Sequence, residues 1–155
     1  MRFQIQPDVE VLDVSVLYRP EEGSFDVEPR HSTVPSAFTS VQVNELQLQV
    51  DEQGRVLYAD GYCPHFGWSE TQAIPPPAHR GTLFIRDVEF IAGVSVALST
   101  SRWPVSVNRK MGWVCVGEQH PCASCSAVEF AAGSIALVGG GSLKSIWLKP
   151  TALPA

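Results

Sequence analysis

Residues 43–61 read VNELQLQVDEQGRVLYADG, and the alternation in this stretch decides the fold class. Leu46, Leu48 and Val50 alternate with glutamines, and the polar tetrapeptide DEQG separates them from the second run, RVLYADG. Period-two alternation places apolar side chains on one face of a strand, and a short polar link that contains glycine is typical of a hairpin. We therefore predict two antiparallel strands joined by a turn that Gly54 closes.

The residues just before this stretch carry the same alternation in the opposite phase. Val41 and Val43 are the apolar positions there, whereas the apolar positions after the change begin at Leu46. A change of phase within one strand requires an extra residue, so the sequence predicts a β-bulge near Asn44 or Glu45.

Similar short runs occur along the rest of the chain, most of them rich in β-branched and aromatic residues and many bounded by Gly, Pro, Asn or Ser. They lie at 9–19, 82–91, 93–100, 102–108, 112–117, 127–138 and 143–149. About eight or nine short strands in a chain of this length indicate an all-β, antiparallel β-sandwich or barrel. With no internal repeat and no break in composition, we predict a single domain over residues 1–155.

Three segments depart from this pattern. Residues 21–40 and 71–81 are predicted to be two long loops, because prolines interrupt the first and three consecutive prolines favour an extended backbone in the second. Residues 124–137 allow a helix as an alternative, since Ser126 and Glu129 have the spacing of a capping box.

The charge of the chain is divided unevenly. Residues 1–61 hold eleven acidic and four basic side chains, a net charge of −7. Residues 62–155 hold five acidic and seven basic side chains, a net charge of +2. Because a nucleic-acid-binding protein normally has a basic excess that displaces counterions, this balance excludes nucleic acid as the expected partner. An acidic first part is compatible with a basic protein partner.

No stretch suggests a membrane protein. The apolar run FIAGVSVAL at 90–98 is far shorter than the roughly 20 residues that span a bilayer, and the N-terminal residues lack the apolar core of a signal peptide. We therefore expect a cytoplasmic protein, in which a stable disulfide is disfavoured.

The densest group of reactive side chains is EQHPCASC, which ends at Cys125. The CxxC spacing of Cys122 and Cys125, with His120 beside them and Cys63 and His65 in the segment GYCPHFGW, provides enough ligands for tetrahedral zinc. A redox pair would need a helix after the first cysteine, which the strand pattern does not supply. The other interpretation is a loop of ordinary cysteines.

A second candidate site lacks cysteines. Residues 91–117 contain no acidic side chain, and guanidinium groups beside aromatic rings are typical of sites for planar or anionic ligands. The predicted ligand-binding residues are Arg102, Trp103, Arg109, Lys110, Trp113 and Trp68. Plain packing of Trp103 in the core is the alternative.

No complete catalytic signature is present, so the sequence favours a small all-β protein that binds a small molecule or a protein, performs no catalysis and holds no cofactor. The alternative is a zinc- or thiol-dependent protein or enzyme centred on Cys63, His65, His120, Cys122 and Cys125. A homodimer formed through an exposed strand edge or the apolar run at 90–98 is a further expectation.

Overall fold

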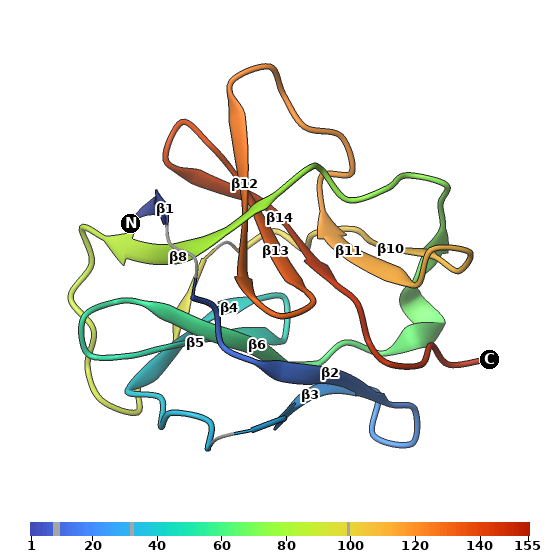
Figure 1. Cartoon of the computed structure of the whole chain (residues 1–155), viewed down its shortest axis with the longest axis horizontal. Coiled ribbons are helices and arrows are strands. Elements are labelled where there is room, and N and C mark those ends of the chain that lie inside the picture. Colours follow the sequence, from blue (N-terminus) through green and yellow to red (C-terminus); the bar gives the residue numbers. More distant parts are fainter. Residues whose placement is uncertain (8–9, 32, 99) are drawn as a thin grey trace.

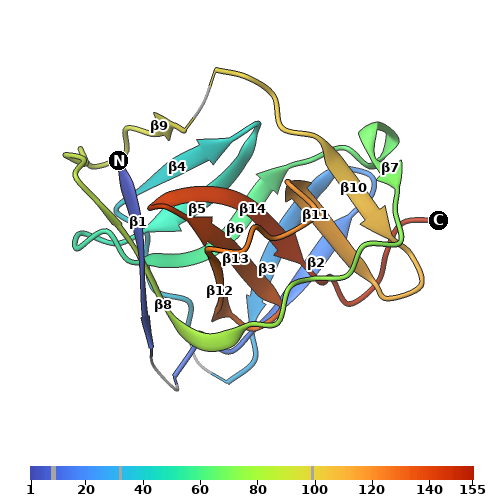
Figure 2. The ribbon, with the colours of Figure 1, turned by 90° about the horizontal axis from the view of Figure 1, so that it is seen from above.

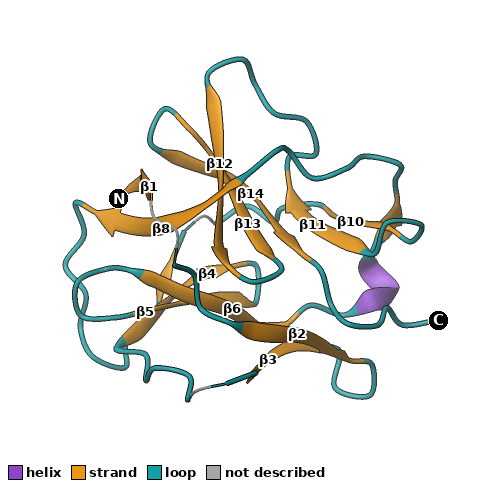
Figure 3. Ribbon diagram, in the orientation of Figure 1, coloured by secondary structure: helices purple, strands orange, loops and turns teal. Residues whose placement is uncertain are grey.

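A computed structural model describes residues 1–7, 10–31, 33–98 and 100–155, and this part of the chain forms two β-sheets that pack face to face (Figure 1). The predicted all-β sandwich is therefore confirmed. Figure 3 shows that strands account for nearly all of the regular structure, with one 3-10 helix at His65–Gly67. None of the helical structure in the described residues is long and apolar enough to cross a membrane.

The first sheet has eight strands, and its central strands form consecutive antiparallel hairpins. In spatial order these are β1 (Arg2–Pro7), β8 (His79–Arg86), β12 (Cys125–Ala131), β13 (Ser134–Gly139), β14 (Ser142–Leu148), β11 (Trp113–Gly117), β10 (Val105–Asn108) and β7 (Ser69–Glu70).

The second sheet has six strands and contains the hairpins formed by residues 14–62. In spatial order these are β2 (Val14–Arg19), β3 (Ser24–Pro29), β6 (Val56–Tyr62), β5 (Leu46–Val50), β4 (Thr39–Val43) and β9 (Val96–Ala97). Figure 2 shows the strands of the two sheets crossing one another when the molecule is seen from above.

Alternation along the strands builds the core between the sheets. In β5 the leucines at 46 and 48 and Val50 are fully buried, while the intervening glutamines are partly exposed. In β2 the buried positions are Val14, Val16 and Tyr18. Because each inward side chain removes apolar surface from water, this pattern fixes which face of each sheet points inward.

The turn predicted at DEQG is present, and a side chain holds it. Asp51 accepts backbone hydrogen bonds from Gln53 and Arg55, both of 2.9 Å. Gly54 has φ of +81°, and its carbonyl accepts a 2.8 Å hydrogen bond from the backbone N–H of Ile85 in the other sheet. The hairpin turn is thus also a connection between the sheets.

The bulge predicted near Asn44 is wrong, because the change of phase marks a two-residue hairpin turn. Val43 pairs directly with Leu46, and Asn44 has φ of +55°, which is the left-handed conformation that asparagine tolerates. Residues paired across a hairpin share a face, so Val43 and Leu46 are both buried.

The prediction of a long loop at 21–40 is also wrong in its first part, since Ser24–Pro29 forms β3 and pairs with β2. Phe25 and Val27 supply its inward alternation. The helical alternative at 124–137 is wrong as well, because this segment is the β12–β13 hairpin. Val9, Ser32 and Ser99, which fall within the predicted ranges, lie outside the described residues.

The described part of the chain contains fourteen strands, more than the eight or nine predicted. The difference arises partly from very short strands such as β7 and β9, which have two residues each and pair in parallel with β10 and β4. A third parallel pairing joins β8 to β12, so both sheets are mixed rather than purely antiparallel.

The proline-rich segment that precedes β8 has a structural role. It crosses the outer face of the eight-stranded sheet, where Ala73 and Ala78 pack on the buried side chains of Cys115, Ile135 and Trp147. This cover explains why all six residues of β13 are buried, although only one of its faces points to the main core.

The close approach at Gly54 predicts a specific loss of stability. A Cβ at this position would lie 2.5 Å from the carbonyl oxygen of Ile85, whereas a Cβ at Gly93 would meet no atom within 4 Å although its φ is also positive. We expect Gly93→Ala to cost about 1 kcal/mol and Gly54→Ala about 1–2 kcal/mol more, measured by urea unfolding. Equal losses in the two variants would contradict the connection between the sheets.

Candidate functional site

A pocket is formed where three connections meet: the β4–β5 turn, the loop after β6 and the segment before β10. We call it the Trp68–Trp103 pocket; its volume is about 230 Å³. Its lining is largely aromatic and aliphatic, with a few polar groups, as is usual for ligand sites. The lining residues include Asn44, Glu45, Leu46, Tyr62, Cys63, Trp68, Arg102, Trp103, Val105 and Val116.

Asn44 attaches the segment before β10 to the β4–β5 turn. Its side-chain N–H donates a 3.0 Å hydrogen bond to the carbonyl of Trp103, and its side-chain oxygen accepts a 2.8 Å bond from the backbone N–H of the same residue. Both functional groups of the amide are therefore used, so the left-handed turn at Asn44 sets the position of Trp103.

An ion pair lies at the rim of the pocket. The guanidinium of Arg102 donates a 2.7 Å hydrogen bond to the carboxylate of Glu45, and the two side chains are 66% and 48% exposed. This hydrogen bond lowers the pKa of Glu45 and raises the pKa of Arg102. Because the charges satisfy each other, the rim offers little net charge to a ligand.

The indole of Trp103 lies against Gly117 at the end of β11. Gly117 has φ of +113°, and a Cβ there would lie 2.8 Å from an indole carbon of Trp103. The backbone N–H of Gly117 also donates a 2.9 Å hydrogen bond to the carbonyl of Pro104. The missing side chain at this position thus makes room for one aromatic wall of the pocket.

The opposite wall is held by Tyr18, the last inward residue of β2. Its hydroxyl donates a 2.8 Å hydrogen bond to the carbonyl of Cys63. The backbone N–H of Cys63 donates another, of 2.8 Å, to the carbonyl of Gly23. Trp68 packs edge-on against the ring of Tyr18, with 4.8 Å between centroids, and stacks on Phe25 at 6.0 Å.

Trp68 has a polar atom without a partner. Its indole nitrogen Nε1 is buried and makes no hydrogen bond to any described residue. The Cys63 thiol, whose pKa burial raises, receives a weak hydrogen-bonding interaction from this N–H that lowers the pKa in part, but the two groups do not have the geometry of a full hydrogen bond. Buried N–H groups of this kind are uncommon, and among the described residues the indole nitrogen of Trp147 is in the same condition.

Two buried groups beside the pocket hold their protons strongly. Burial raises the pKa of the Cys63 thiol to about 11, and the nearby indole N–H of Trp68 offsets part of that rise. Burial likewise raises the pKa of Tyr18 to about 12. Cys63 is therefore a neutral thiol at neutral pH rather than a thiolate.

The pocket brings together Trp68, Arg102 and Trp103 from the predicted ligand set, together with Cys63 from the predicted metal set. Asn44 and Glu45 were not among the predicted site residues. The phase change at residues 44 and 45 is the one signal in the sequence that points to them, since it marks a turn in which asparagine is favoured.

The other predicted ligand-binding residues lie elsewhere. Arg109 and Lys110 line a wider hollow of about 690 Å³ at the β10–β11 turn. There the guanidinium of Arg109 forms a 2.6 Å ion pair with Glu70. Trp113 lies at the start of β11, with the ammonium of Lys149 5.7 Å from its ring centroid.

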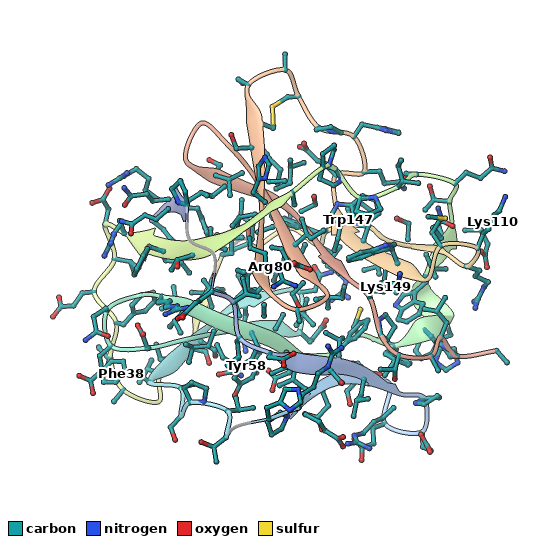
Figure 4. The ribbon with its side chains drawn as sticks, viewed as in Figure 1. Phe38, Tyr58, Arg80, Lys110, Trp147 and Lys149 are labelled. Atoms are coloured by element: carbon teal, nitrogen blue, oxygen red, sulfur yellow. A yellow bond between two sulfur atoms is a disulfide. The ribbon has the colours of Figure 1, made fainter. Side chains whose placement is uncertain are left out.

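The predicted zinc set is not assembled. Cys122 and Cys125 form a disulfide, which lies in the β11–β12 connection at the top of Figure 4. The loop that contains Cys63 and His65 follows β6 in the other sheet, and His120 is exposed. Within the described ranges, no three His, Cys, Asp or Glu side chains are grouped so that they could hold a metal ion.

The expectation that a disulfide is disfavoured is therefore wrong for this pair. Its Cα atoms are 5.1 Å apart because the turn at 122–125 brings the two cysteines together, with the N–H of Cys125 bonded to the carbonyl of Cys122 at 3.1 Å. Cys63 and Cys115 are the free cysteines, and both are buried.

Comparison with protein-family models, with curated proteins and with solved structures finds no match to this chain. Function must therefore be argued from the site alone.

The disulfide predicts the thiol content of the protein. When it is purified without reductant and unfolded in guanidinium, we expect two thiols per chain to react with a thiol reagent, and four after reduction. Four reactive thiols before reduction would contradict the disulfide and would show that Cys122 and Cys125 are reduced.

The raised pKa of Cys63 predicts a loss of stability at alkaline pH. The unfolded chain loses the thiol proton near pH 9, whereas the folded chain retains it to about pH 11. The contribution to the free energy of unfolding is thus fully present below pH 9 and is lost as the pH rises through 11. We expect the urea midpoint to fall less steeply over this range for Cys63→Ala than for the wild type. If the urea midpoint falls equally with pH in the wild type and in Cys63→Ala, the raised pKa of Cys63 is contradicted.

Proposed function

We propose that the protein binds a small, neutral, planar molecule in the Trp68–Trp103 pocket and performs no chemistry on it. The observation that carries this proposal is the buried Nε1–H of Trp68, which has no partner among the described residues. Leaving a buried donor unsatisfied costs about 1–3 kcal/mol. A ligand in the pocket recovers this free energy if a shift of the Trp68 indole brings the buried N–H to its acceptor atom.

The walls of the pocket support a flat ligand. The rings of Tyr62, Trp68 and Trp103 line it together with aliphatic side chains, and a volume of about 230 Å³ suits one or two fused rings. The rim carboxylate and guanidinium of Glu45 and Arg102 neutralise each other, so a neutral ligand does not have to break this pair.

The chemistry of the thiols supports binding rather than catalysis. Burial raises the pKa values of Cys63 and Cys115 to about 11 and about 12, so both thiols are poor nucleophiles at neutral pH. The ring nitrogen Nδ1 of His65 lies 3.5 Å from the Tyr18 hydroxyl. The zinc- or thiol-dependent alternative therefore has less support than binding.

We also propose an oxidising environment in place of the expected cytoplasm. Structural disulfides such as Cys122–Cys125 are typical of oxidising compartments and are rare in the cytosol. The thiol content of the protein isolated from its own cells tests this part of the proposal.

Two bicyclic probes of the same shape test the ligand class. Quinoline has a ring nitrogen that accepts a hydrogen bond, and naphthalene has none. At pH 8, where quinoline is neutral, we expect calorimetric titration to give saturable binding of both, with quinoline about tenfold tighter. A tenfold difference corresponds to ~1.4 kcal/mol, the scale of one hydrogen bond to a buried donor.

Trp68→Phe provides the matched variant because it keeps an aromatic ring and removes the N–H. We expect it to weaken quinoline binding about tenfold and to change naphthalene binding by less than about threefold. Trp113→Phe, outside the pocket, is the control and changes neither. Absence of saturable binding of both probes would contradict the proposed function, and equal affinities in the wild type would remove the role of Nε1–H.

A further inference from the structure

The end of the sandwich next to the pocket carries a surface that shares the loop at Tyr62 with the pocket and otherwise extends beyond it. It consists of the β2–β3 turn at residues 20–23, the loop and 3-10 helix at 62–67, the exposed Ile74 and the β10–β11 turn at 109–111. We call this surface the turn face. In Figures 1 and 2 its two turns and the 3-10 helix lie at the same end of the molecule, where the chain also ends.

Hydrogen bonds and ion pairs join the parts of the turn face. The N–H of Cys63 donates to the carbonyl of Gly23, which attaches the β2–β3 turn to the loop before the 3-10 helix. Beyond this helix, β7 pairs with β10, and Glu70 forms an ion pair with Arg109. These contacts connect the two turns through the 3-10 helix and β7.

Exposed apolar side chains gather on this face. Among the described residues, seven large apolar side chains are exposed, and four of them belong to the turn face. These are Phe66 (83% exposed), Ile74 (62%), Met111 (48%) and Tyr62 (47%). We take the occurrence of four of these seven side chains at one end of the molecule as the mark of an interaction surface.

The same face carries both signs of charge at separate turns. Glu21 and Glu22 are exposed on the β2–β3 turn, whereas Lys110 extends from the tip of the β10–β11 turn, away from the body of the molecule (Figure 4). Within the part of the chain that the structure describes, Glu21 and Lys110 belong to no ion pair. Each is available to a partner.

We propose that the turn face is the interface of a symmetric homodimer. A two-fold rotation places the basic turn of each chain opposite the acidic turn of the other, so the contact between opposite charges occurs twice in the dimer. Phe66, in the helix between the two turns, then packs against apolar side chains of the second copy. A partner of a single charge would be attracted by one turn and repelled by the other, which favours a second copy over an acidic or basic protein.

Sedimentation velocity and light scattering over a range of protein concentrations test this inference. We expect dimers at about 50 µM, and at least a tenfold rise in the dissociation constant for Phe66→Asp. Ile91→Asp alters an apolar side chain that is 61% exposed and lies outside the turn face, so it serves as the control and leaves the dimer unchanged. A monomeric wild type, or a dimer that only Ile91→Asp dissociates, would overturn the proposal.

Charge reversal tests the two-fold pairing with variants on exposed turns, where folding is least affected. Lys110→Glu and Glu21→Lys each place like charges opposite one another at both contacts, and we expect each to weaken the dimer about threefold to tenfold. An equimolar mixture of the two variants restores opposite charges at both contacts and returns the affinity to within about twofold of the wild type. A mixture no tighter than the separate variants would overturn the pairing.

Discussion

Burial of alternate side chains between two sheets is the constraint on which the rest of the structure depends. In β2 this alternation ends at Tyr18, so the hydroxyl that holds the Cys63 carbonyl is placed by the same pattern that places Val14 and Val16 in the core. In the β4–β5 hairpin, the burial of Val43 and Leu46 leaves a two-residue turn in which Asn44 contacts Trp103. The pocket is thus a consequence of strand register at two separate hairpins.

Local patterns predicted the parts of the fold that depend on neighbouring residues. The β5–β6 hairpin with its Gly54 turn follows from alternation and a glycine, and both are short-range signals. The segment 24–29 was missed because its alternation is short and lies among prolines and acidic residues. The strands β7 and β9 have only two residues each, too few to show a period, and they form because other strands offer them an edge.

The sequence predicted candidate residues for the site, but it did not predict which of them the fold brings together. Arg102 and Arg109 are close in sequence, yet the extended strand β10 separates them, so they line different hollows. Cys63 joins Trp103 rather than Cys122 because sheet topology, which is set by long-range pairing, directs the loop after β6 toward the β4–β5 turn. The sequence did not predict the disulfide, because the oxidation state of the CxxC pair was expected to follow from a cytoplasmic location.

In the proposed complex, the indole N–H of Trp68 donates a hydrogen bond to a ligand atom. Two-dimensional ¹H–¹⁵N NMR reports it directly, since the indole N–H groups of the four tryptophans give separate signals that single Trp→Phe variants assign. On addition of quinoline, we expect a marked downfield proton shift of the Trp68 signal, because a new hydrogen bond forms, and little change at Trp113 and Trp147. If quinoline binds and the Trp68 signal does not shift, a hydrogen bond from this N–H to the ligand is contradicted.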